Sequence, residues 1–187
     1  MIKKILKHTG RLIAVSLGIA SLYLFNLFFM KPVSIDHYLG KELVLDLTGS
    51  PEELTYVGIL DRFNWLTNHN SKLSIPQDSD IEDGIKHTEK IIRTLYKYND
   101  SNLSDITKNT KKIAIFDYEN QLKELQYFPY LDYPLNQIGG IHLNTIEFMN
   151  SVHPIRTKSE AKAFIKRTDL IKEVYEGTLN HLKKQAD

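Results

Sequence analysis

The most informative passage of this chain is Tyr130-Leu131-Asp132-Tyr133-Pro134-Leu135-Asn136-Gln137-Ile138-Gly139-Gly140-Ile141-His142-Leu143. It continues through apolar positions to a second turn, as Ile146, Phe148, Met149 and then Val152-His153-Pro154-Ile155. The glycine pair predicts a turn, and Asn144 with Glu147 predicts the start of a helix after it. Proline at 154 disfavours the α conformation at His153 and predicts the end of that helix.

Four residues of the first turn are candidates for a substrate groove or for a structural motif. The side chains of Asn136 and Gln137 could hydrogen-bond the backbone of a peptide substrate. Alternatively, they satisfy backbone groups around Gly139 and Gly140, where we expect positive φ. We expect the structural role.

His153 and Pro154 complete the candidate site, again with a structural alternative. A zinc peptidase needs two imidazoles one helical turn apart, with a glutamate between them to activate water. None of the seven histidines lies four residues from another. A site assembled from distant histidines such as His142 and His153 is conceivable, but we expect His153 to fix a turn by bonding nearby backbone. We therefore nominate no catalytic residue and no metal ligand.

The passage resembles the N-terminal part of a bacterial family catalogued as domain of unknown function 885. Further matches follow in the family's order, at Ser50-Pro51-Glu52-Glu53-Leu54-Thr55 with Gly58, Leu95 to Ile106, and Thr157 to Arg167. Together they cover about residues 35–180. Gly140 departs from the family's pattern, where a bulkier residue is expected, as does Thr168-Asp169, where a leucine often follows the arginine.

The resemblance implies a helical zinc metallopeptidase-like protein whose His-Glu-x-x-His helix comes much later in a longer chain. This sequence contains no such motif up to Asp187. We therefore expect the front portion of such a protein, without cofactor in this chain and with zinc only in full-length relatives. The expected partner is the missing C-terminal catalytic part.

An apolar segment at residues 12–30 predicts a membrane anchor. It holds nineteen residues without formal charge, and a helix of that length is roughly 28 Å long, close to the hydrocarbon thickness of about 30 Å. Basic residues before it predict a cytoplasmic N-terminus and an extracytoplasmic bulk, periplasmic in a Gram-negative cell. The expected location is the cytoplasmic membrane, with the lipid bilayer as partner. The alternative is a cleaved signal peptide.

The exported part reads as an all-α array. Capping boxes are predicted at Ser50, Ser79, Asn144 and Thr157, each followed three residues later by glutamate. Between Ser104 and Leu125 two apolar stripes predict a helix packed between neighbours. Apolar spacing also predicts a helix from 79 to about 98, with Leu95 and Tyr96 inward. Residues 70–80 read as a flexible loop.

Charge and cysteine content exclude several classes of function. The chain has 24 basic and 23 acidic side chains, and five of the basic ones with no acid fall in residues 1–31. The remainder is therefore mildly acidic, whereas nucleic-acid binding needs a concentrated basic face. We expect no nucleic-acid partner. The absence of cysteine excludes a disulfide framework and a thiolate nucleophile.

These observations divide the chain into four parts. We expect a basic cytoplasmic N-terminus at 1–11, the anchor at 12–30, a juxtamembrane linker with a first helix at 31–49, and an incomplete helical domain at 50–187. The predicted function is the membrane-anchored N-terminal scaffold of a zinc metallopeptidase-like protein. The alternatives are an independent membrane-anchored helical interaction module, or a truncated gene product without activity.

Overall fold

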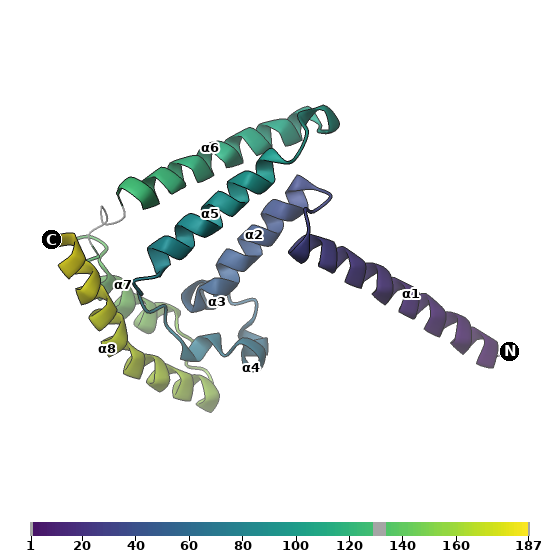
Figure 1. The fold of residues 1–187 in the computed structure, drawn as a ribbon. Coiled ribbons are helices and arrows are strands. Elements are labelled where there is room, and N and C mark those ends of the chain that lie inside the picture. The colour runs from purple at the N-terminus through teal and green to yellow at the C-terminus, as the bar shows by residue number, and fades with distance from the viewer. Residues whose placement is uncertain (1, 129–133, 187) are drawn as a thin grey trace.

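The computed structural model describes residues 2–128 and 134–186, and within these ranges the secondary structure is entirely helical. Figure 1 shows one long helix projecting away from a group of packed helices. The predicted all-α class is confirmed. Residues 129–133, which begin the passage that carries the family resemblance, lie outside the described residues.

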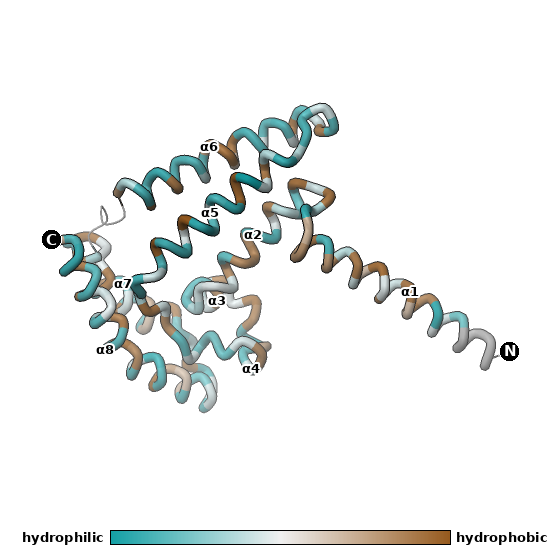
Figure 2. The backbone as a smooth tube through the Cα atoms, viewed as in Figure 1, coloured by the Kyte–Doolittle hydropathy of each residue, from teal (hydrophilic) through white to brown (hydrophobic). Residues whose placement is uncertain are grey.

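Helix α1 (Ile2–Phe29) is the projecting helix. Its span His8–Phe29 is long and apolar enough to cross a membrane, and none of that span is buried against the rest of the protein. Figure 2 shows apolar residues along much of its length. The one apolar N-terminal helix expected from the sequence is therefore present.

The end of α1 is fastened to the packed helices by the segment that follows it. The Tyr98 hydroxyl donates to the Pro32 carbonyl at 2.7 Å, and both residues are buried. Lys31 Nζ donates to the Lys97 carbonyl at 3.0 Å and lies 4.6 Å from the centre of the Tyr98 ring. These contacts link α1 to the helix that ends at Tyr96.

The first half of the domain is built from three helices, α2 (Ile35–Gly49), α5 (Asp80–Tyr96) and α6 (Asp105–Tyr127). Figure 1 shows α5 and α6 side by side, joined through the 3₁₀-helix η3 (Asp100–Asn102), with α2 next to α5. Serine hydroxyls at Ser34 and Ser104 accept backbone N–H groups and start α2 and α6. The shared core consists of Ile35, Tyr38, Ile91, Leu95 and Tyr98.

The second half consists of short helices packed against one long one. Its elements are α3 (Pro51–Val57), η1 (Asp61–Phe63), α4 (Asn64–Thr67), η2 (His69–Ser71), α7 (Ile141–Glu147), the π-helix η4 (Phe148–Val152) and α8 (Lys158–Ala186). Its core is Leu73, Phe148, Met149 and Val174. In the π-helical turn the successive residues Phe148 and Met149 are both buried.

Two of the four predicted capping boxes provide side-chain caps. Ser50 Oγ accepts from Glu53 N, and Thr157 exchanges both bonds with Glu160. Ser79 makes no capping hydrogen bond. Asn144 lies inside α7, whose N-cap is Gly140, and its amide donates to the Gly139 carbonyl instead. Both of these predictions are wrong, and at Asn144 the reason is that the chain already enters the helix at Ile141.

The outer side of α6 differs from the prediction of a helix packed on both sides. One stripe packs on α5, but Ile106, Ile113 and Phe116 on the other are 81%, 69% and 68% exposed. Tyr96, predicted to face inward, is also exposed, and its hydroxyl donates to Glu119. Periodicity identifies an apolar face, but it cannot supply the neighbour that would cover it.

The segment between η2 and α5 is irregular but held against α8. Leu73 is buried, and Gly177 of α8 passes so close to Pro76 that an added Cβ would lie 2.5 Å from the Pro76 carbonyl oxygen. Asn70, placed by the sequence in the flexible loop, is buried instead. This segment therefore forms one wall of the site described next.

Candidate functional site

Arg167 of α8 is the most deeply buried charged residue that the structure describes, with 0% of its surface exposed. Its neighbours Lys166 and Thr168 are exposed. Arg167 faces inward because it follows Ala163 by one helical turn and precedes Val174 by two, and both are buried. An arginine therefore occupies a core position of an amphipathic helix.

Five acceptors surround the guanidinium of Arg167, and they come from several segments. Nε donates to Lys72 O at 2.8 Å, and Nη1 donates to His153 Nδ1 at 2.8 Å. Nη2 lies near three acceptors: Thr55 Oγ1 at 2.8 Å, His69 O at 2.9 Å and Pro51 O at 3.2 Å. The planar fork of arginine suits several fixed acceptors at once. A single side chain thus connects α8 with α3, with η2 and with the turn that precedes α8.

The charge on Arg167 is stabilised without a direct carboxylate partner among these five. Burial lowers the pKa of Arg167 to about 10, and the more distant carboxylates of Glu52 and Asp61 oppose this shift. The guanidinium also lies 4.7 Å from the centre of the Phe148 ring, at cation–π distance. At neutral pH the group remains protonated, because the pKa is still well above 7.

His153 occupies the turn where the sequence predicted it. Its backbone is extended, as expected before proline, and its Nε2 lies 3.3 Å from the Glu160 carbonyl. Because Nδ1 accepts from Arg167, we assign the ring hydrogen to Nε2, which then donates to that carbonyl. The prediction that His153 bonds nearby backbone is confirmed. Burial lowers the pKa of His153, the hydrogen bond to the Glu160 carbonyl opposes this shift, and the charge of Arg167 adds to it.

A second buried histidine, His69, contacts Arg167 through its backbone carbonyl. Its Nδ1 is 2.6 Å from the Thr67 hydroxyl, and its Nε2 is 3.4 Å from Asp61 Oδ1. Burial lowers the pKa of His69, and the nearby Asp61 carboxylate partly opposes this. Arg156 links Asp61 to Glu160 through ion pairs of 3.0 and 2.9 Å. The start of α8 is thereby connected to η1.

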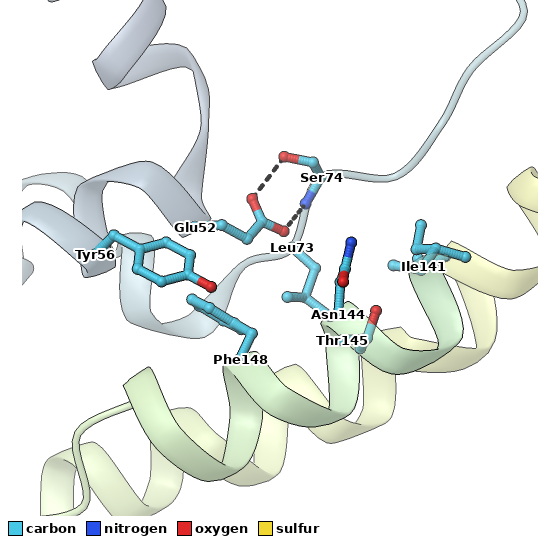
Figure 3. Close-up of a pocket in the computed structure, with 9 residues that line it drawn as sticks. Glu52, Tyr56, Leu73, Ser74, Ile141, Asn144, Thr145 and Phe148 are labelled. Atoms are coloured by element: carbon cyan, nitrogen blue, oxygen red, sulfur yellow. Dashed lines mark hydrogen bonds between the residues drawn. The ribbon is translucent and has the colours of Figure 1, made fainter. Parts of the chain in front are cut away.

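A cavity of about 300 Å³ opens on the other side of Phe148. Figure 3 shows its residues, which come from α3, α7, η4, α8 and the segment before α5: Glu52, Tyr56, Leu73, Ser74, Ile141, Asn144, Thr145, Phe148 and Val174. The Glu52 carboxylate is fixed at the rim, because it accepts from Ser74 N and Ser74 Oγ, both at 2.7 Å. An apolar floor beneath a carboxylate and an amide can hold an apolar group and orient polar atoms next to it.

The first predicted turn is structural at Asn136. Its Oδ1 accepts from the backbone N–H groups of Ile138 and Gly139 at 3.0 and 2.7 Å, as expected for a side chain that supports a turn. Gln137 is exposed on the surface. The role of these residues in a substrate groove stays a prediction.

The expectation of positive φ at the glycine pair is wrong. Among the glycines that the structure describes, positive φ occurs at Gly58, and Gly140 has φ −70°. Gly140 is required for a different reason, since an added Cβ would lie 2.6 Å from Asn136 N and 2.8 Å from the His142 ring. A bulkier residue at this position, as the family pattern suggests, would not fit this backbone.

The predicted site residues fall in two places. Asn136, Gln137, Gly139 and Gly140 precede α7, whereas His153 and Pro154 follow η4 and lie at Arg167. Sequence reasoning missed Arg167 and Glu52. Arg167 could have been found as the one charged position in the inward series 163, 167, 174 and 178 of α8.

The titratable residues do not assemble a metal site in the parts of the chain that the structure describes. Within residues 2–128 and 134–186, no group of three or more His, Asp or Glu side chains is placed to hold a metal ion. His153 is directed at Arg167 and at a backbone carbonyl, and His69 lies between Thr67 and Asp61. We therefore derive no metal-dependent step from these residues.

Replacing Arg167 by methionine should strongly destabilise the domain. The substitution removes five hydrogen bonds, three of them buried and two partly buried, and we expect the free energy of unfolding to fall by about 3 kcal/mol or more. Arg167→Lys should also be destabilised, because an ammonium cannot match the fork. Chemical denaturation of the full chain in detergent, followed by circular dichroism, measures the loss.

The exposed neighbour of Arg167 provides the matched control for this measurement. Lys166→Met makes the same kind of change on the outer face of α8 and should alter stability by less than about 0.5 kcal/mol. Equal stability of the Arg167→Met and Lys166→Met variants would contradict the structural role of the buried guanidinium.

Acidification should destabilise the protein through His69 and His153. Burial lowers both pKa values below the ordinary value of 6.5, so the unfolded chain binds these protons first as the pH falls. Stability is then full above about pH 6.5 and decreases below it, by at most about 1.4 kcal/mol per pH unit for each histidine. Denaturation between about pH 7.5 and 5.5 measures the slope, in a range above the usual carboxylate pKa values. The His69→Gln and His153→Gln double variant should show a smaller slope, and an unchanged slope would disprove the assignment.

Three residues quoted for the family resemblance, Pro51, Thr55 and His153, contact Arg167, which ends the third quoted segment. This proximity connects motifs that are far apart in the sequence. Family membership nevertheless stays a prediction made from the residues. Comparison of the chain with models of known families, with curated proteins and with solved structures found no match.

Proposed function

We propose that this protein is a membrane-anchored, extracytoplasmic helical scaffold, the N-terminal portion of a zinc metallopeptidase-like protein. In this role it supplies one wall of a substrate channel, while water activation belongs to another part of the protein. The observation that carries the proposal is α1, whose span His8–Phe29 is apolar, is not buried against the rest of the protein and is followed by residues that bond the folded domain. An exposed apolar helix of this length is stable in a bilayer and costly in water.

The Arg167 cluster supports a scaffolding role. Arg167 bonds acceptors that lie up to 116 residues away in the sequence, so it fixes short helices with little core of their own. These include α3, with seven residues, and the three-residue η2. Such short helices are marginal alone and depend on tertiary contacts. The cluster therefore holds the cavity walls in place.

The cavity supports a role in contacting substrate. Leu73, Phe148 and Val174 offer apolar surface of the kind that accepts an aliphatic or aromatic side chain. Glu52 and Asn144 lie at the same cavity and present groups that hydrogen-bond a peptide backbone or an amino terminus. A peptide is the ligand class that uses both features.

Anchoring can be tested with charged substitutions in α1. We expect the full chain to stay in the membrane pellet after an alkaline wash, and alkaline phosphatase fused after Asp187 to be active. Leu17→Glu with Leu22→Glu should abolish both, because each charge at the centre of a span costs about 2.5–3.5 kcal/mol. Ile106→Glu with Ile113→Glu on α6 is the matched control and should remain anchored.

Two results would contradict the proposal. Release of the unsubstituted chain by the alkaline wash would remove the anchor. Chelator-sensitive hydrolysis of a peptide library by the purified chain would remove the purely scaffolding role.

An independent interaction module is the second candidate, and the outer face of α6 favours it. Ile106, Ile113 and Phe116 form an exposed apolar stripe, whereas surface apolar residues in soluble domains are usually scattered. The same stripe suits docking of a further part of a larger protein. The identity of the bound polypeptide separates the two functions.

Photo-cross-linking can identify that polypeptide. A photoreactive amino acid at Phe116 should give adducts in the native cells, because this side chain lies in the apolar stripe. The control position Gln121 is also exposed but lies on a different side of α6, and it should give few adducts. A cross-linked polypeptide that contains a His-Glu-x-x-His segment supports the scaffold function. Cross-linking to any other protein supports the independent interaction module. Absence of adducts at Phe116 would contradict both uses of this face.

A further inference from the structure

A basic pocket of about 380 Å³ lies between the end of α1 and the C-terminal part of α5. Phe29 and Met30 form its apolar side, and the rest is lined by Thr94 and by four basic residues, Lys31, Lys90, Arg93 and Lys97. Lys90 and Arg93 of α5 and its C-cap Lys97 follow one another at spacings of three and four, which places them on one stripe of the helix. The pocket therefore joins a basic helix face to the last apolar residues of α1.

The depth of this pocket follows from the length of α1. The apolar span of 22 residues ends at Phe29, and at about 1.5 Å per residue it is roughly 33 Å long, slightly more than the hydrocarbon thickness. Lys31 and the pocket then lie at the level of the lipid headgroups. Phe29 and Met30 lie at the boundary with the acyl chains.

The charges of the pocket are poorly compensated. Four cations line it and no carboxylate does. Glu89 pairs with Arg93 at 3.1 Å, but both side chains are exposed and such pairs are weak. An anion would therefore meet a net positive charge here.

Stabilisation of a helix terminus explains only part of this arrangement. Lys31 caps the Lys97 carbonyl at the end of α5, as cations near a helix C-terminus do. Lys90 lies nearly two turns before that end, where the effect of the helix dipole has faded. Its position in one pocket with Phe29 and Met30 calls for a ligand that is both anionic and apolar.

We propose that this pocket binds the phosphate of an anionic phospholipid in the leaflet at the C-terminal end of α1. The Arg93 guanidinium and the Lys90 and Lys97 ammonium groups donate to the phosphate oxygens, and Phe29 and Met30 contact the acyl chain. The proposal rests on the membrane anchoring proposed above. It adds a lipid selectivity that anchoring alone does not require.

Native mass spectrometry of the full chain released from nanodiscs tests the selectivity. The nanodiscs contain phosphatidylcholine with a minor fraction of phosphatidylglycerol, and the readout is the ratio of the two lipids retained. We expect enrichment of phosphatidylglycerol, and a loss of roughly tenfold or more in that enrichment for Lys90→Gln with Arg93→Gln and Lys97→Gln. Lys162→Gln with Lys166→Gln and Lys172→Gln on exposed positions of α8 is the charge-matched control and should retain it.

Each remaining outcome overturns the proposal in a recognisable way. If both triple variants lost the phosphatidylglycerol enrichment equally, the enrichment would come from the overall charge of the protein and not from this pocket. Displacement of the lipid by inorganic phosphate at low millimolar concentration would assign the pocket to free phosphate. A further outcome is that the unsubstituted chain and both triple variants all insert into pure phosphatidylcholine nanodiscs but show no enrichment of phosphatidylglycerol in mixed ones. That result would contradict the lipid site and support the anchor. Failure of the unsubstituted chain to insert would remove both.

Discussion

A single buried cation holds the second half of this domain together. Arg167 donates to Pro51, Thr55, His69, Lys72 and His153, and these groups belong to segments that share little apolar core. Desolvation makes such a charge costly, and the full set of acceptors offsets that cost only when every segment is in place. The interaction therefore favours one arrangement of the short helices over looser alternatives. The cavity beside Phe148 exists because this arrangement is fixed.

The two halves of the domain differ in how their helices are held together. In the first half, α2, α5 and α6 share an apolar core centred on Ile91 and Leu95, and the polar contacts lie at its edge. Lys111 makes one of these polar contacts: it is buried, and its Nζ donates to Tyr98 O and to Asp100 Oδ1, both at 2.6 Å. In the second half the apolar core is accompanied by a buried polar cluster around Arg167.

Helix α1 and the folded domain meet at Tyr98. Its ring belongs to the first core, its hydroxyl holds Pro32, and Lys31 lies over its face. The residues that follow α1 are therefore held by Lys97 and Tyr98, directly after α5. The same contacts place the basic stripe of α5 next to Phe29 and Met30. The exposed apolar helix and the basic stripe therefore belong to one structural unit.

The sequence alone determined the features that depend on neighbours along the chain. These are the helical class, the caps at Ser50 and Thr157, the apolar span of α1 and the turn at His153, all of which follow from local periodicity and backbone preference. Only the tertiary structure decided that Arg167 is buried, that Glu52 lies at a cavity and that one face of α6 stays open. The physical reason is that a helical pattern reports which residues share a face. The partners of Arg167 lie 14 to 116 residues away, and no local pattern encodes such contacts.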